Sequence, residues 1–335
     1  MAKLKNINGH FVESDYENAL IAFLEREGWQ YLFGDSIPRA NRKEVLIVDD
    51  LLQFLKDNNK NVKGEELQRI ADNVRLVGAD FDFATLHKVY KWMVNGVPAV
   101  DKDGKPTTVN LIDFACLDNP QKENTNIFRV VNQFTVEYIN NGAVKNRRPD
   151  VLLYVNGIPV CVIELKNPAD ANATIEDAWE QINIRYWRDI PGLLHYCPLA
   201  CISDGVKTRL GTVRTPYEHF YAWRRVENDD KVSTMPFDEL ETMVRGVYRP
   251  ERFLEIFRDY VYFQDENYDS DEKEIVCRYP QFFATRLLRE SVIKSVKTKS
   301  GKGGTYFGAT GCGKTYTMAF LARQLSLRCA AEIGS

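Results

Sequence analysis

The 335-residue sequence lacks the marks of several broad protein classes. No apolar run approaches the roughly 20 residues that a membrane-spanning helix needs, and there is no internal repeat or low-complexity tract. The net charge is -3, so no overall basic excess marks the chain as a nucleic-acid-binding protein. Any contact with DNA must therefore come from local basic patches. The length favours two domains in a soluble globular protein.

Side chains that commonly bind transition metals are few and dispersed. The four histidines are His10, His87, His195 and His219, and neither they nor the seven cysteines have zinc-site spacing. An odd number of cysteines without a signal peptide suits a reducing compartment. We therefore expect a cytoplasmic protein, with the histidines in ordinary surface or core roles.

Helical and strand periodicities are mixed along the chain. Ser14 and Glu17 have the spacing of a capping box at the start of the first expected helix. The apolar patterns predict helices at about 15–27, 44–57, 64–76, 175–189 and 280–297, part of a helix within 80–95, and helical structure in 254–263. They predict strands near 108–114, 126–138 and 198–203, and a hairpin in 147–168. This order predicts an α/β fold.

A phosphate-binding loop is the most specific motif. The stretch GATGCGKT matches the pattern G-x-x-x-x-G-K-[ST], in which backbone N–H groups face phosphates, Lys314 reaches the β- and γ-phosphates and Thr315 binds Mg²⁺. Segment 305–325 is expected to form a short strand, this loop and a helix. The candidate nucleotide-binding residues are Gly308, Thr310, Gly311, Cys312, Gly313, Lys314 and Thr315.

Little of the sequence follows this loop. Because only 20 residues come after Thr315, there is no room for a later strand that ends in the second acidic metal ligand of such ATPases. We therefore expect the chain to bind ATP weakly or not at all and to have little or no ATP turnover by itself.

The stretch RRPDVLLYVNGIPVCVIELKNP contains two apolar runs joined at Asn156-Gly157, with charged residues at their ends. Asp150 and Glu164 on adjacent strands could hold one or two Mg²⁺ ions, which lower the pKa of bound water and screen charge on a phosphodiester. Lys166, two residues beyond Glu164, shares its face of the strand and could orient the water or stabilise developing charge. This arrangement is typical of a metal-dependent nuclease.

Strand parity imposes a condition on that hypothesis. A plain two-residue turn at Asn156-Gly157 pairs residue 150 with 163, so Asp150 and Glu164 would face opposite sides of the sheet. A three-residue loop or a β-bulge puts the two carboxylates on one side, and Pro159 favours irregular pairing beside the turn. The sequence therefore predicts an odd loop or a bulge.

Lys145, Arg147 and Arg148 form a basic patch just before Asp150 that suits contacts with DNA phosphates. The alternative is that all these charges are solvated strand ends in a catalytically silent DNA-tethering module.

At these residues the chain resembles the N-terminal part of the R subunit of type I restriction-modification enzymes. The resemblance rests on RPDVLLYVNGIPVCVIELKNP, on SDG followed by GTVRTPYEHFYAW in 203–223, and on RYPQFFATRLL before the phosphate loop, and it covers about 10–325. It implies a PD-(D/E)xK nuclease domain with a restriction-endonuclease-like mixed sheet flanked by helices, then RecA-like motor domains of helicase superfamily 2.

The resemblance also implies roles for individual residues. Asp150, Glu164 and Lys166 would be the nuclease triad, and Gln281 would read adenine. The Gln-x-x-x-Tyr motif of the family has its nearest match in Gln181 and Tyr186, which are one residue too far apart to share a face of an α-helix. Either the helix bulges there or only one of the two keeps the role.

Related nucleases place a helix glutamate beside the metal. Glu17 is the candidate here, unless it only caps its helix, and Glu13 is the alternative.

The resulting hypothesis divides the chain into a nuclease domain at 1–225, an acidic, helical connector at 226–300 and the start of a RecA-like ATPase domain at 301–335. By resemblance, it cuts double-stranded DNA non-specifically, with Mg²⁺, after ATP-driven translocation stalls, and its partners are methyltransferase and specificity subunits. The alternatives are a stand-alone nuclease–helicase of DNA repair or phage defence, the tethering module, or a small-molecule kinase, which the late position of the phosphate loop disfavours.

Overall fold

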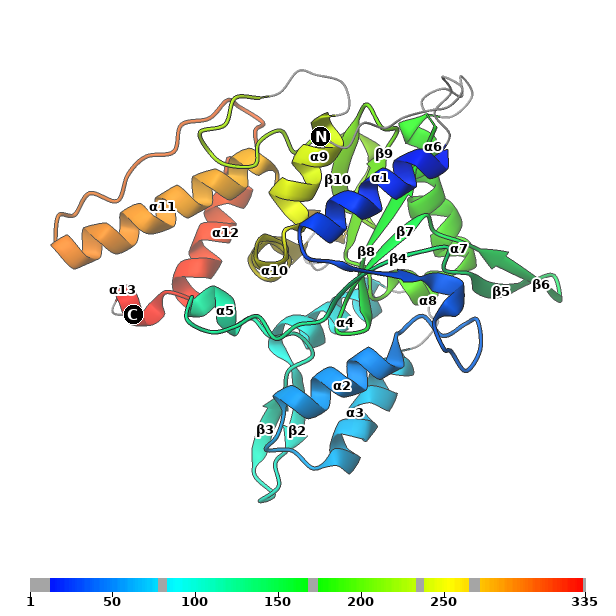
Figure 1. Cartoon of the computed structure of the whole chain (residues 1–335). Coiled ribbons are helices and arrows are strands. Elements are labelled where there is room, and N and C mark those ends of the chain that lie inside the picture. The colour runs from blue at the N-terminus through cyan, green and yellow to red at the C-terminus, as the bar shows by residue number, and fades with distance from the viewer. Residues whose placement is uncertain (1–12, 78–82, 168–173, 233–237, 265–271, 334–335) are drawn as a thin grey trace.

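The computed structural model describes residues 13–77, 83–167, 174–232, 238–264 and 272–333, and it places helices on both sides of a mixed sheet (Figure 1). The α-helices are α1 (Glu13–Arg26), α2 (Val48–Asn58), α3 (Gly64–Arg75), α4 (Phe83–Asn95), α5 (Ala115–Asp118), α6 (Ile175–Glu180), α7 (Trp187–Asp189), α8 (Pro191–Leu194), α9 (Asp238–Met243), α10 (Pro250–Asp259), α11 (Tyr279–Thr298), α12 (Lys314–Leu327) and α13 (Ala330–Ile333). Two 3-10 helices, η1 (Gly34–Ser36) and η3 (Tyr217–His219), and two π-helices, η2 (Gln181–Tyr186) and η4 (Val244–Tyr248), complete the helical structure described.

The strands form one large sheet and three two-stranded ribbons. They are β1 (Gln30–Phe33), β2 (Val97–Val100), β3 (Pro106–Val109), β4 (Phe128–Asn132), β5 (Val136–Asn140), β6 (Ala143–Arg147), β7 (Val151–Val155), β8 (Ile158–Leu165), β9 (Leu199–Ser203), β10 (Thr208–Thr212), β11 (Val261–Gln264) and β12 (Lys273–Val276). The sheet has the order β1-β4-β7-β8-β9-β10, with β1–β4 and β8–β9 parallel and the other pairs antiparallel. The ribbons are β2–β3, β5–β6 and β11–β12. The predicted α/β class, with a mixed central sheet flanked by helices, is confirmed.

The two central strands explain why the hairpin sequence is so apolar. Every residue of β7 and β8 is buried, which requires cover on both faces of the sheet. On one face, Trp29 packs edge-on against Phe128 and donates a hydrogen bond to the Tyr248 carbonyl. On the opposite face, Tyr186 of η2 contacts Glu164. The sheet therefore separates a face covered by α1 and η4 from a face covered by α6 and η2.

Several predicted elements are confirmed with shifted bounds, namely the helices that became α1, α2, α3, α4 and α11, the continuous helical run α6–η2–α7, and strand β9. The expected strand near 108–114 is shorter and earlier, as β3. The expected strand at 126–138 is two strands, because Gln133 has a positive φ of 54° between β4 and β5. The expected helix in 254–263 ends at Asp259, and β11 follows it.

The break after β4 lets the ribbon β5–β6 leave the sheet. Figure 1 shows this ribbon extending away from the body of the molecule beside α7. Its tip carries the cross-strand pair Ile139 and Val144, both more than half exposed. The chain then returns through Arg148 directly into β7, so the ribbon stands next to the start of the central hairpin.

The C-terminal helices pack on α10. The Arg289 guanidinium donates to Gln324 Oε1 at 2.9 Å, joining α11 to α12, and the Tyr260 and Phe320 rings lie 5.5 Å apart. The region expected to be a helical connector also contains the ribbon β11–β12. The domain boundaries at 225 and 300 stay predictions.

The expected strand before the phosphate loop is wrong. Residues 301–309 are described and contain no strand, and none of the strands in the described ranges pairs with them. The helix expected after the loop is confirmed as α12. Among the residues that the structure describes, no helix is both long and apolar enough to cross a membrane.

Candidate active site

The hairpin β7–β8 contains the predicted irregularity. Asn156 and Gly157 form a two-residue turn with φ values of 52° and 76°, so the three-residue loop is not what the chain uses. The register then shifts between Leu153 and Tyr154, which leaves Val160 as the extra residue of a bulge. Beyond the bulge Val151 pairs with Ile163, and extending that register by one residue places Asp150 opposite Glu164.

The two carboxylates are close and differently exposed. The Asp150 backbone N–H lies 3.4 Å from Glu164 Oε1, and Asp150 Oδ2 accepts a 2.7 Å hydrogen bond from the Leu165 N–H. Glu164 is fully buried, whereas Asp150 is half-buried and faces the rim. The pair therefore sits at an edge of the sheet where a ligand can reach Asp150 from outside.

Burial governs the acidity of the pair. Burial raises the pKa of the Glu164 carboxyl well above its ordinary value, and the neighbouring Asp150 raises it further. Burial also raises the pKa of Asp150, against the lowering effect of the Leu165 N–H and the Lys166 ammonium. Two like charges in a poorly solvated position favour either a bound proton or a bound cation.

Lys166 starts a chain of hydrogen bonds that ends on Glu164. Its ammonium donates to Gln181 Oε1 at 3.1 Å, and Gln181 Nε2 donates to the Tyr186 hydroxyl at 2.8 Å. The Tyr186 hydroxyl in turn donates to Glu164 Oε1 at 2.6 Å. Lys166 Nζ lies 3.9 Å from Glu164 Oε2, which closes the ring. All three hydrogen bonds run in the same direction, from Lys166 through Gln181 and Tyr186 to the Glu164 carboxylate. The ring therefore orients Glu164 and holds Lys166 beside it.

A π-helix makes this ring possible. Gln181 and Tyr186 begin and end η2, and the i→i+5 bonding of a π-helix brings residues five apart onto one face. The five-residue spacing, too long for an α-helix, is thereby accommodated. Of the two alternatives raised by the sequence, the bulged helix is confirmed.

The carboxylates suit a divalent cation. Glu164 Oε2 is buried and has no hydrogen-bond partner among the described residues, with the Lys166 ammonium 3.9 Å away, so it can accept a further bond. Within the same residues no group of three or more His, Cys, Asp or Glu side chains is placed to hold a metal. Mg²⁺ fits such a site, because it usually keeps several waters and takes only one or two carboxylates together with substrate phosphates.

The three residues of the predicted basic patch have different surroundings. Lys145 and Arg148 are exposed, but Arg147 binds Asp189 through Nε at 2.7 Å and Nη2 at 2.5 Å. A hydrogen bond from Arg188, and to a lesser extent the bond from Arg147, lowers the pKa of Asp189 to about 2. Arg147 is therefore anchored to α7, while Lys145 and Arg148 face solvent.

Glu17 lies on the other side of the sheet. Its Oε1 accepts hydrogen bonds from Asn132 Nδ2 at 2.5 Å and Gln133 Nε2 at 3.3 Å. Asn132 pairs with Val151 and so faces opposite to Asp150. The helix α1 includes Ser14, so the expected capping box does not form. The metal-site role of Glu17 stays a prediction; Glu13 begins α1, but its side chain lies outside the described part of the structure.

The phosphate loop wraps around its own lysine. Lys314 Nζ donates to the carbonyls of Gly308 and Ala309, both at 2.9 Å. Gly313 has φ 81° and caps α12. Gln281 is buried and donates to the Gly313 carbonyl at 3.1 Å, so this glutamine contacts the loop. Of the other candidates, Thr310, Gly311 and Thr315 are exposed and Cys312 is half-buried.

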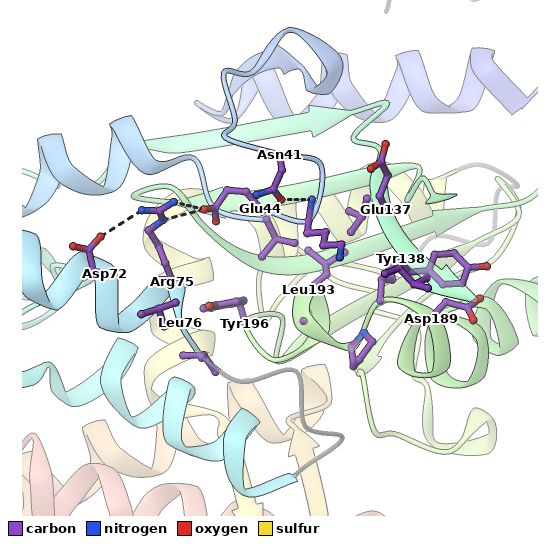
Figure 2. Close-up of a pocket in the computed structure, with 18 residues that line it drawn as sticks. Asn41, Glu44, Asp72, Arg75, Leu76, Glu137, Tyr138, Asp189, Leu193 and Tyr196 are labelled. Atoms are coloured by element: carbon purple, nitrogen blue, oxygen red, sulfur yellow. Dashed lines mark hydrogen bonds and ion pairs between the residues drawn. The ribbon is translucent and has the colours of Figure 1, made fainter. Parts of the chain in front are cut away.

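A cavity of about 780 Å³ lies between α3, β5 and α8 (Figure 2). Glu44 and Asp72 bind Arg75 on one side of it, and Tyr138 and Asp189 lie on the other. The carboxylate pair does not line this cavity. Size alone therefore does not identify the active site.

A smaller, polar cavity of about 530 Å³ borders the ring instead. Gln181 and Tyr186 line it together with the predicted Arg147 and Arg148. The sequence analysis missed its remaining lining residues, which are Asp35, Arg42, Thr135 and Asn146. The one signal that could have indicated Arg42 is the basic stretch RANRK at 39–43.

Comparisons with known proteins agree over most of the chain. Residues 10–219 match the family described as "Type I restriction enzyme R protein N terminus". The protein of Methanocaldococcus jannaschii named "Putative type I restriction enzyme MjaIXP endonuclease subunit" is 29% identical over 93% of this chain and 31% of its own length. The HindI endonuclease subunit of Haemophilus influenzae is 28% identical over 93% of this chain and 30% of its own.

A shorter relative is covered almost completely. The EcoprrI type I restriction enzyme endonuclease subunit of Escherichia coli is 25% identical over 88% of both chains. The chain thus spans about 30% of the length of the first two relatives.

Proposed function

The chain belongs to the family of type I restriction enzyme R protein N termini, and from this premise we propose that it forms the Mg²⁺-dependent endonuclease region of such a subunit. The observation that carries the proposal is the ring of Lys166, Gln181, Tyr186 and Glu164 beside Asp150, in which one buried carboxylate oxygen has no hydrogen-bond partner among the described residues. The mixed sheet with this pair at its rim supports a restriction-endonuclease-like fold.

Asp150 and Glu164 would hold the cation, which when bound lowers the pKa of water and polarises the phosphodiester. Tyr186 fixes Glu164 Oε1 by its hydrogen bond, and Oε2, which has no hydrogen-bond partner among the described residues, would be the oxygen that binds the cation. The Lys166 ammonium donates to Gln181 Oε1 and to the Leu165 carbonyl, each at 3.1 Å. These bonds hold it where it can orient a water or stabilise developing negative charge.

The activity of the whole subunit is a wider proposal. We propose that the phosphate loop with Lys314 and Gln281 binds ATP as the start of a RecA-like motor, and that cleavage of double-stranded DNA is non-specific and follows ATP-driven translocation. The names of the relatives support a restriction complex, in which methyltransferase and specificity subunits would be partners. Co-purification with such subunits distinguishes this proposal from a stand-alone nuclease–helicase.

Plasmid cleavage by the assembled complex tests the nuclease assignment. Asp150→Asn and Lys166→Met should each abolish cleavage while ATP hydrolysis continues, because neither residue contacts the phosphate loop. Asp103→Asn, which changes an exposed carboxylate in the β2–β3 turn, is the matched control and should cut at the normal rate. Normal cleavage by either active-site variant would instead favour a catalytically silent DNA-tethering module.

A further inference from the structure

The 530 Å³ cavity beside the ring has the composition of an anion site. Its lining brings together segments distant in sequence, and three guanidinium groups, Arg42, Arg147 and Arg148, border it against the single carboxylate of Asp35. The neutral groups along its wall are donors as well as acceptors, which suits phosphate oxygens. An excess of fixed positive charge in a concave polar site attracts anions and raises their local concentration.

The three arginines are not equivalent. Arg147 is engaged by Asp189 and lies over the Tyr138 ring at 5.9 Å, so it is fixed in place. Arg42 and Arg148 form no ion pair with any residue that the structure describes, and both are exposed. Their guanidinium groups therefore remain available to a ligand, and the fork of an arginine matches two phosphate oxygens.

The cavity shares a wall with the carboxylate pair. Tyr186 lines the cavity and donates its hydroxyl proton to Glu164, and Arg148 is only two residues from Asp150. A DNA strand carries a phosphate at every nucleotide, so a strand bound at the carboxylates has further phosphates beside the one held there.

We propose that this cavity binds the phosphodiester next to the one that is cut, with Arg42 and Arg148 as its ligands and Arg147 as a positioning residue. The proposal rests on the nuclease function proposed above and adds a second contact to the same DNA strand. Since phosphate contacts carry no sequence information, the cavity would hold any DNA sequence equally well.

The test is a binding titration of a fluorescent duplex with the 335-residue chain, in EDTA so that no DNA is cut, over a series of salt concentrations. Arg42→Gln and Arg148→Gln should each weaken binding on the order of tenfold at low salt. Each should also reduce the slope of log K against log salt by less than about 0.9, because the other arginine still contacts the shared phosphate, and loss of both should reduce it by about 0.9, the value for one phosphate contact. The losses should be the same for AT-rich and GC-rich duplexes.

Arg245→Gln is the matched control, because Arg245 is an exposed arginine on η4 outside the cavity. It should keep the wild-type affinity and slope. In the double variant Arg42→Gln/Arg148→Gln the losses should be less than additive, since both side chains bind one phosphate. The proposal is wrong if the wild-type chain does not bind the duplex at low salt, if either cavity variant behaves like Arg245→Gln, or if the two losses simply add.

Asp150→Asn separates this proposal from the nuclease assignment. In the assembled complex with Mg²⁺ it should not cut. Cleavage by Asp150→Asn would refute the nuclease assignment and leave the phosphate cavity standing.

Discussion

Replacing Glu164 by glutamine removes the buried charge and keeps the shape and the acceptor for Tyr186. Burying a carboxylate costs several kcal/mol, of which the Tyr186 hydrogen bond and the Lys166 ammonium offset a part. We therefore expect Glu164→Gln to stabilise the metal-free chain by about 2 kcal/mol at pH 8. Over 335 residues the unfolding entropy is about 0.7 kcal/mol/K, so the melting temperature should rise by about 3 °C.

The same variant should lose its response to magnesium. At a Mg²⁺ concentration about ten times Kd, binding stabilises the wild-type chain by about 1.4 kcal/mol, or about 2 °C. Glu164→Gln offers a neutral amide in place of the metal ligand, so Mg²⁺ should leave its melting temperature unchanged. Differential scanning fluorimetry in EDTA and in Mg²⁺ measures both effects.

Glu274→Gln is the matched control, because Glu274 is also a buried carboxylate and neither of its oxygens has a hydrogen-bond partner among the described residues. Burial raises its pKa well above the ordinary value as well. Its replacement should raise the melting temperature in EDTA and preserve the Mg²⁺ response. A Glu164→Gln chain that melts below the wild type in EDTA, or that keeps the Mg²⁺ response, would refute the reasoning.

Four further outcomes follow from the same contacts. The pKa of Glu164 is higher in the folded chain than in the unfolded chain, so protonation of Glu164 stabilises the wild type. This stabilisation is complete below the unfolded pKa and is lost as pH rises through the folded pKa. The difference in melting temperature between Glu164→Gln and the wild type should therefore narrow from pH 8 to pH 5. Tyr186→Phe removes the 2.6 Å hydrogen bond to that carboxylate and should cost about 2 kcal/mol in urea unfolding at pH 8. Gly157→Ala places a Cβ at positive φ, 2.1 Å from the Ile47 carbonyl oxygen. It should lower the free energy of unfolding by on the order of 2–4 kcal/mol and so the melting temperature by several degrees. Gln281→Ala removes the bond to the Gly313 carbonyl and should weaken binding of a fluorescent ATP analogue to the assembled complex.

Local sequence signals were sufficient for the central hairpin. Asn156-Gly157 marked the turn, and the parity of Asp150 and Glu164 required an irregularity that the structure supplies as a bulge at Val160. Both signals act within about 15 residues, where turn chemistry and the two-residue period of a strand dominate. The buried strands followed from their apolar composition for the same reason.

The remaining features depend on distant partners. The π-helix forms where Tyr186 meets Glu164, a contact between elements that the sequence does not locate relative to each other. Arg42 lines the same cavity as Gln181 and Tyr186 because the segment before α2 lies against β5, where the Glu137 N–H donates to the Arg42 carbonyl at 3.0 Å. The strand expected at 305–307 needs a neighbouring strand to pair with, and none is present among the described residues.

The central claim is that Asp150 and Glu164 hold the metal ion that serves the DNA cut. The most direct measurement is an anomalous-difference map from crystals of the 335-residue chain grown with a DNA duplex and Mn²⁺. The account predicts a peak between the two carboxylates, within coordination distance of Glu164 Oε2 and in contact with a DNA phosphate. Bound DNA without a peak there, or a Mn²⁺ peak at other ligands, would contradict it.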